Sequence, residues 1–308
     1  KLAPWVETWL QTAGVNTLRP VLKLNGENYE LVSIRQKSPN IPAGSKELRP
    51  HRMAVGLYDL SGDRLKLRKS VELDVSGELT NVAELSGEKV ADLLLINDRD
   101  LSYGKIRFDE RSIATLKKNL GKLDDSLARA LCWSASWDML RDAEISASDF
   151  VDIVIAGLPG EDDVTTISAI GNQLASAIEV YSAPKNRDSQ RERVAELIQT
   201  QLDKSAAGSD LQLQYARIFA TVAQTPAHGQ KVRDLLEGKL PGLVVDADLR
   251  WHLLISLVER GLSSRDEVDA ELKRDNTLTG QLSHERCLAA FPELAAKESA
   301  FKKATENF

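Results

Sequence analysis

The chain contains four histidines, which are the first candidates for metal chemistry: His51, His228, His252 and His284. A zinc site on a helix needs two histidines one turn apart, with a glutamate between them as general base. The segment His284–Leu288 begins with His-Glu, but Leu288 occupies the place of the second histidine. We interpret this segment as an ordinary helix start capped by Ser283. The sequence therefore predicts no metal-ligand residue in this chain.

Other catalytic motifs are also missing from the sequence. It has no glycine-rich phosphate loop of the G-x-x-x-x-G-K-[ST] or G-x-G-x-x-G type and no G-x-S-x-G nucleophile elbow. The acidic pairs Asp124-Asp125 and Asp162-Asp163 precede predicted helices, where carboxylates are favoured by the helix dipole. We interpret both pairs as helix caps. No catalytic and no cofactor-binding residue is predicted.

Two aromatic groups allow two interpretations each. Trp133 and Trp137 lie one helical turn apart and could form a shelf for a ligand, but core packing is the favoured interpretation. Arg250-Trp251 could bind a peptide carboxylate or form a cation–π contact, but a half-buried helix face is the favoured interpretation.

Composition and cysteine content limit the class of protein. The 308 residues are 42% hydrophobic and 28% charged, with a net charge of −6, as in soluble globular proteins. This net charge offers no broad basic field for nucleic acid, and no apolar run reaches the ~20 residues of a membrane span. Cys132 and Cys287 are too few for a disulfide framework. We therefore expect buried thiols and a cytoplasmic protein without nucleic-acid or membrane partners.

The first third of the chain has the pattern of a β-sandwich. A short amphipathic helix over residues 1–13, ended by Gly14, precedes it. Apolar residues then alternate in short segments separated by turn residues, beginning with a hairpin at Asn25-Gly26. A loop is expected over 39–50. Strands are predicted at 18–24, 29–34, 52–60, 64–73, 75–85 and 92–96.

After Arg111 the periodicity becomes helical to the end of the chain. Ile167, Ile170, Leu174 and Ile178 form an i+3/i+4 stripe that is typical of one buried helix face. Successive helices with short polar connections favour a HEAT-like helical array, in which each pair packs against its neighbours. Helices are predicted at 112–121, 125–142, 147–157, 164–181, 187–202, 211–222, 230–236, 248–261, 265–273 and 283–290.

Several segments resemble the C-terminal region of bacterial zinc aminopeptidase N enzymes, which belong to the gluzincin, membrane-alanyl-aminopeptidase-like family. The segment 49–60 (RPHRMAVGLYDL) resembles part of the β-sandwich domain of that family. The segment 93–112 (LLLINDRDLSYGKIRFDERS) resembles the part that leads from the last sandwich strands into the helical domain. The segment 126–142 (SLARALCWSASWDMLRD) is similar to its first helical hairpin. The segments 249–261 and 267–280 resemble its later helices, and 9–20 resembles the segment that joins the catalytic domain to the sandwich.

The resemblance implies a division of the chain and a function for the parent enzyme. Residues 1–17 would be the trailing helix and linker of a missing catalytic domain, 18–108 the sandwich, and 109–308 an ERAP-like helical domain truncated at its C-terminus. The parent would be a zinc metallopeptidase that releases N-terminal amino acids from peptides. Its H-E-x-x-H zinc site has no match here, so we expect a chain that is inactive alone. Its expected role is to enclose the active-site chamber and control peptide access.

A free-standing helical-repeat adaptor that binds peptides or proteins is the alternative from a different functional class. The coding sequence upstream of Lys1 distinguishes the two possibilities. An H-E-x-x-H motif there favours the peptidase, whereas a start codon close to Lys1 with no such motif favours the adaptor.

Overall fold

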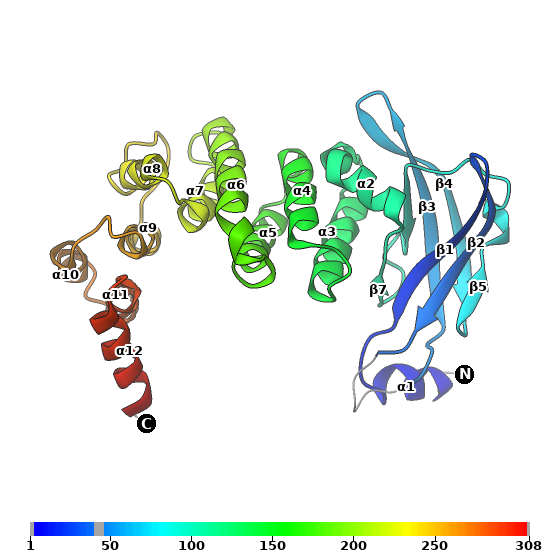
Figure 1. Ribbon diagram of the computed structural model, residues 1–308, viewed down its shortest axis with the longest axis horizontal. Helices are drawn as coiled ribbons and strands as arrows, with labels where there is room; N and C mark the ends of the chain where they lie inside the picture. The colour runs from blue at the N-terminus through cyan, green and yellow to red at the C-terminus, as the bar shows by residue number, and fades with distance from the viewer. Residues whose placement is uncertain (1–2, 40–45, 307–308) are drawn as a thin grey trace. The chain divides into compact units, whose positions relative to one another are not determined.

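The computed structural model describes residues 3–39 and 46–306 and contains two compact units, Lys1–Glu161 and Asp162–Phe308 (Figure 1). The first unit holds all the described strands and the helices up to α4, and the second holds α5 to α12. The parts of the predicted first helix and of the predicted loop that fall on residues 1–2 and 40–45 lie outside the described residues. The division into 1–17, 18–108 and 109–308 follows the type of secondary structure and is kept as a proposal.

One sheet of the sandwich has the strand order β5-β2-β1-β7. β1 and β2 form an antiparallel hairpin whose turn contains Gly26 with a φ of 60°, a left-handed conformation that glycine adopts without strain. β7 pairs in parallel with the start of β1. The bounds are β1 (Thr17–Asn25), β2 (Asn28–Lys37), β5 (Leu79–Asn81) and β7 (Lys105–Ile106).

The second sheet has the order β4-β3-β6, with β3 (His51–Ser61), β4 (Arg64–Val75) and β6 (Leu93–Ile96). The two sheets bury Leu18 and Ile34 on one side and Val55 and Leu57 on the other, each with 0–1% exposure. A hydrogen bond of 3.0 Å between His51 Nε2 and the Gln36 side-chain oxygen also joins β3 to β2. The predicted β-sandwich followed by helices is confirmed.

The predicted strand at 75–85 is wrong. β4 ends at Val75, and Gly77 takes a φ of 67° in a tight turn that is closed by hydrogen bonds between Ser76 and Thr80. Only the short β5 follows, and residues Ala83–Leu85 form the 3-10 turn η1. Val82 and Leu85 are buried at 1% and 0% exposure although neither belongs to a strand, whereas Leu79 of β5 is 50% exposed.

Helix α1 (Ala3–Leu10) is held to the sandwich by the buried side chain of Arg49. Its guanidinium donates to the carbonyl oxygen of Thr8 at 2.8 Å and to the hydroxyl of Thr12 at 2.6 Å. A third hydrogen bond of 2.7 Å reaches the side-chain oxygen of Asn16. The guanidinium also lies 5.5 Å from the centre of the Trp9 ring. One planar cation therefore fixes the end of α1 and the chain that follows it.

Helices α2 (Glu110–Asn119), α3 (Ser126–Arg141) and α4 (Ala147–Gly157) complete the first unit. Each begins at a side-chain cap, provided by Asp109, Asp125 and Ser146. The cap predicted at Asp125 is thus confirmed, whereas Asp124 pairs with Arg64.

The second unit consists of eight helices among its described residues. The Asp163 carboxylate caps α5 by accepting from the backbone N–H of Thr166 at 2.6 Å, as predicted. Contacts join α5 and α6 to α7, α8 and α11 to α9, and α10 and α12 to α11. The bounds are α5 (Val164–Ser176, continued by a π-helical turn Ala177–Tyr181), α6 (Pro184–Lys204), α7 (Asp210–Val222), α8 (Pro226–Leu236), α9 (Ala247–Glu259), α10 (Arg265–Arg274), α11 (Leu278–Ala290) and α12 (Leu294–Glu306). The HEAT-like character stays a prediction, and α12 was not predicted as a separate helix.

The predicted helix start at Ser283 is wrong. Helix α11 begins at Leu278, and the hydroxyl of Thr277 caps it by accepting from the backbone N–H of Gly280 at 3.1 Å. A Cβ at position 280 would lie 1.9 Å from the carbonyl oxygen of Asp275, so glycine is required for this close approach. Gly280 therefore belongs to the helix, although glycine usually signals a break.

Replacement of Trp133 by Ala should destabilise the first unit by about 3–5 kcal/mol. The Trp133 side chain is 3% exposed, and a Cβ at Gly157 would lie 2.4 Å from its ring, which shows how closely α4 approaches α3. Trp5→Ala is the matched control, because Trp5 is 48% exposed and its removal should cost less than about 1 kcal/mol. Urea denaturation measures the unfolding free energy of both variants. An equal decrease in the two would contradict the packing role of Trp133.

Candidate functional site

Each of the four histidines has its own hydrogen-bond partner. His51 bonds the Ser102 hydroxyl at 2.7 Å, His252 the carbonyl oxygen of Arg217 at 2.9 Å, and His284 the Asp269 carboxylate at 2.7 Å. His228 forms part of the capping box at the start of α8. Within residues 3–39 and 46–306 no group of three or more His, Cys, Asp or Glu side chains could hold a metal ion. The residues present do not fit a zinc site.

The two cysteines are buried, and neither has the environment of a nucleophile. Burial raises the pKa of the Cys132 thiol, and it raises the pKa of the Cys287 thiol to about 12. A reactive cysteine needs the opposite shift, because only the thiolate attacks. The prediction of buried thiols is confirmed for both positions.

The tryptophan and arginine side chains considered from sequence serve packing and pairing. Trp133 is buried and donates its indole N–H to Glu161 at 3.1 Å, which confirms core packing. Trp251 is 3% exposed, more buried than the predicted half-buried face, and donates to Asp275 at 2.9 Å. Arg250 makes two hydrogen bonds of 2.7 and 2.8 Å to Glu271, so that carboxylate already occupies its guanidinium.

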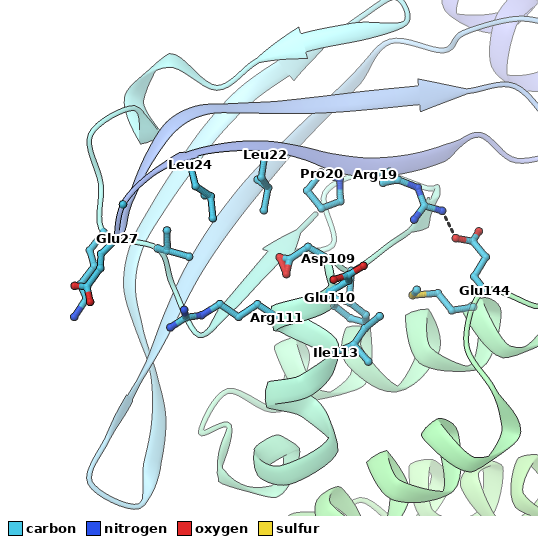
Figure 2. A pocket seen from close by; sticks show the side chains of 15 residues that line it. Arg19, Pro20, Leu22, Leu24, Glu27, Asp109, Glu110, Arg111, Ile113 and Glu144 are labelled. Carbon is cyan, nitrogen blue, oxygen red and sulfur yellow. Dashed lines mark hydrogen bonds and ion pairs between the residues drawn. The ribbon is translucent and has the colours of Figure 1, made fainter.

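A groove of about 820 Å³ lies in the first unit between β1 and helix α2, and Figure 2 shows its lining. Pro20, Leu22 and Leu24 point from β1 towards the helix. Charged side chains surround this apolar wall: Arg19, Glu27, Lys89, Asp109, Glu110, Arg111 and Glu144. The lining contains no histidine, cysteine or serine, so the groove has no thiol or hydroxyl that a neighbouring histidine could activate.

Asp109 is the most buried carboxylate of the groove, and its role is structural. It accepts hydrogen bonds from the backbone N–H of Ser112 at 2.8 Å and from the Ser112 hydroxyl at 3.0 Å. Burial raises its pKa although these hydrogen bonds act in the opposite direction. The carboxylate caps α2 rather than serving as a general acid or base.

An ion-pair network at one end of the groove joins the sandwich to the segment between α3 and α4. Glu144 pairs with Arg19 (Figure 2) and accepts from the Arg107 guanidinium at 2.6 Å. Asp142 pairs with Arg107 and with Lys105, the latter at 2.8 Å. The Arg107 side chain is only 1% exposed. The sequence does not reveal this network, because each of these cations lies at least 35 residues before the carboxylate with which it pairs.

The carboxylates of this network are ionised more easily than usual. Partial burial acts to raise the pKa of Asp142 and of Glu144. The hydrogen bonds and charges of Arg19, Lys105 and Arg107 act more strongly in the opposite direction, so both pKa values lie below the ordinary range. The network is therefore fully charged at neutral pH.

His51, by contrast, is uncharged at neutral pH, because burial and the charge of Arg49 lower its pKa to about 4. Its ring lies 5.3 Å from that of Trp9 in a T-shaped arrangement. A neutral ring can accept from the Ser102 hydroxyl at Nδ1 and donate to the Gln36 side-chain oxygen from Nε2. His51 is therefore a neutral bridge inside the sandwich at physiological pH.

Two comparisons with known proteins match this chain. The family model described as "ERAP1-like C-terminal domain" matches residues 93–307. Aminopeptidase N from Streptomyces lividans is 41% identical over 313 aligned residues, which cover 99% of this chain and 36% of that protein. The chain thus spans about one third of the length of this relative. Both matches agree with the resemblance that the sequence showed. No helix among the described residues combines the length and the apolar character that a membrane crossing requires.

Removal of the two network carboxylates should destabilise the protein at pH 7, and this destabilisation should become smaller as the pH falls from about 4 towards 3. In Asp142→Asn/Glu144→Gln the buried Arg107 loses both partners, which costs about 3 kcal/mol or more. The wild-type carboxylates have lowered pKa values, so their contribution is present above pH ~4 and disappears as protons bind below it. Urea denaturation at several pH values from 7 to 3 measures the difference in unfolding free energy between the wild type and this double variant. Asp63→Asn/Glu78→Gln, at two exposed positions, is the control and should have little effect. If this difference in unfolding free energy does not change with pH, the proposed contribution of the network is contradicted.

His51 should make stability fall as the solution is acidified from pH 6.5 to pH 4. The unfolded chain binds a proton in this window, whereas the folded protein does not, so acid favours unfolding. The full effect is on the order of 3 kcal/mol for a shift from 6.5 to about 4. In His51→Asn the slope of unfolding free energy against pH should decrease by up to one proton in this window. An unchanged slope would show that His51 is protonated in the folded state.

Proposed function

Because the chain belongs to the ERAP1-like C-terminal domain family, we propose that it forms the non-catalytic C-terminal part of a zinc-dependent aminopeptidase. The observation that carries this proposal is the 41% identity to an aminopeptidase N over 99% of the chain. The parent enzyme would remove N-terminal amino acids from peptides. Its zinc ion and general base would lie on polypeptide outside these residues, since the residues described here do not fit a zinc site.

The role proposed for this part is to enclose the active-site chamber and control peptide access. Eight packed helices follow one another in the second unit among its described residues, and six of them begin at a side-chain cap, which suits a wall that keeps its form without ligand. Exclusion of bulk water from such a chamber strengthens the electrostatic interactions that stabilise a transition state. The sandwich would serve as the spacer between the helices and the catalytic domain.

The partner proposed for helix α1 is the catalytic domain. Trp5 and Leu10 are 48% and 68% exposed on a helix of eight residues, although both are large and apolar. The relative extends well beyond the matched segment, so its own counterpart of α1 has further polypeptide available to cover it. A cytoplasmic location is proposed with the function, and the buried, unpaired cysteines support it.

A chimeric enzyme tests the proposal. This chain replaces the matching 36% of the Streptomyces lividans aminopeptidase N, and kcat/KM is measured on an aminoacyl-arylamide and on peptides of increasing length. The chimera should hydrolyse peptides and reject folded proteins. The same enzyme with the segment deleted is the control and should lose this selection, since nothing covers its cleft.

The isolated chain with added Zn²⁺ completes the test. It should release no amino acids and bind no stoichiometric zinc. Turnover by the isolated chain would overturn the proposal. Selective binding of unfolded peptides by the isolated chain, together with an inactive chimera, would favour the adaptor function instead.

A further inference from the structure

Five cationic side chains meet at one end of the outer face of the β5-β2-β1-β7 sheet: Arg19, Arg35, Lys37, Lys105 and Arg107. The strand register causes this. Arg19 of β1 lies opposite Arg35 of β2, and Thr17 lies between Lys37 of β2 and Lys105 of β7. Cross-strand partners project from the same face, and residues two apart along a strand do so as well. All five cations therefore share one face.

This arrangement carries more positive charge than the protein neutralises. Like charges on opposite strand positions destabilise a sheet unless anions lie between them. Two negative charges face them: Asp142 pairs with Lys105 and Arg107, and Glu144 pairs with Arg19 and Arg107. Arg35 and Lys37 are exposed, and their side chains have no hydrogen bond or ion pair with any residue that the structure describes. Five cations less two carboxylates leave a local charge of +3, in a chain whose net charge is −6.

The cations line a cavity of about 620 Å³ that also contains Gly14, Val15, Thr17, Ser38 and Pro39. This volume lies within the range of small-molecule sites. Asp142 and Glu144 form one wall, and their charges are already compensated by the buried Arg107 and its neighbours. The uncompensated charge is therefore concentrated on the wall formed by β2.

We propose that this cavity binds a small multivalent anion, held by Arg35 and Lys37 together with the outward sides of Arg19 and Lys105. A guanidinium binds phosphate or carboxylate oxygens through two parallel hydrogen bonds, and an ammonium adds a point charge. The shared chemistry is a compact group of several anionic oxygens, as in a phosphate compound or a polycarboxylate. The site is independent of the proposed peptidase function.

The bound anion should also stabilise the first unit. It would neutralise the repulsion between the opposed cations of β1 and β2, and it would bind the folded state alone because the strand register creates the site. Binding to the folded state raises stability in proportion to the logarithm of ligand concentration. The melting temperature should therefore rise with anion concentration at constant ionic strength.

Calorimetric titration of the 308-residue chain with inorganic pyrophosphate, inorganic phosphate and citrate tests the site, with NaCl used to keep ionic strength constant. We expect saturable binding of at least one anion. Binding of phosphate or pyrophosphate would indicate a phosphate ligand, and binding of citrate would indicate a polycarboxylate. In Arg35→Gln/Lys37→Gln the dissociation constant should increase about tenfold or more. Both positions are exposed and unpaired in the described structure, so this variant should fold, which circular dichroism verifies.

Lys66→Gln/Lys118→Gln is the matched control, since it removes the same charge from two exposed positions outside the cavity. Its affinity should equal that of the wild type. Absence of saturable binding by all three anions up to about 10 mM would overturn the proposal. Equal weakening in both double variants would also overturn it, because it would show that the anion responds to overall charge.

Discussion

The first compact unit depends on the pairing of the Arg107 guanidinium with Asp142 and Glu144. A guanidinium cannot lose its proton in a protein, so a side chain that is 1% exposed must find anionic partners in the folded state. Those partners come from the segment between α3 and α4, where Ala143 adopts a φ of 58°. The pairing therefore ties strand β7 to a strained connection that leads directly into the Ser146 cap of α4. Loss of one partner costs more than the intact pairing contributes, because it leaves a buried charge uncompensated.

The elements with strong local signals could be predicted from the sequence. Asn25-Gly26 determines the turn between β1 and β2, and α4 occupies Ala147–Gly157 as expected from its apolar periodicity and its flanking residues. Asp125 and Asp163 cap α3 and α5 because a carboxylate ahead of a helix has few alternatives to the free backbone N–H groups. The sandwich followed by helices was predictable from the change of periodicity near Arg111. Each of these features is encoded within a few neighbouring residues.

The features that were missed depend on residues distant in sequence. The 75–85 segment has strand-like residues, but the Gly77 turn removes it from the sheet pairing, and only β5 remains. Gly280 lies inside α11 because the Asp275 backbone approaches it, which no local pattern reveals. The cationic face of the first sheet arises from register, since Arg19 and Arg35 become neighbours only when β1 pairs with β2. Sequence motifs for zinc chemistry, by contrast, can be judged from the sequence alone, because the spacing of their residues is local.

The edge-on contact between Trp9 and His51 gives the protein an internal optical reporter. A protonated imidazole quenches the fluorescence of an adjacent indole, whereas a neutral imidazole does so only weakly. The two rings lie 5.3 Å apart, and the Arg49 guanidinium lies on the same indole. Emission from Trp9, one of five tryptophans, therefore becomes sensitive to the contact between α1 and the sandwich when His51 is protonated at pH values below about 4.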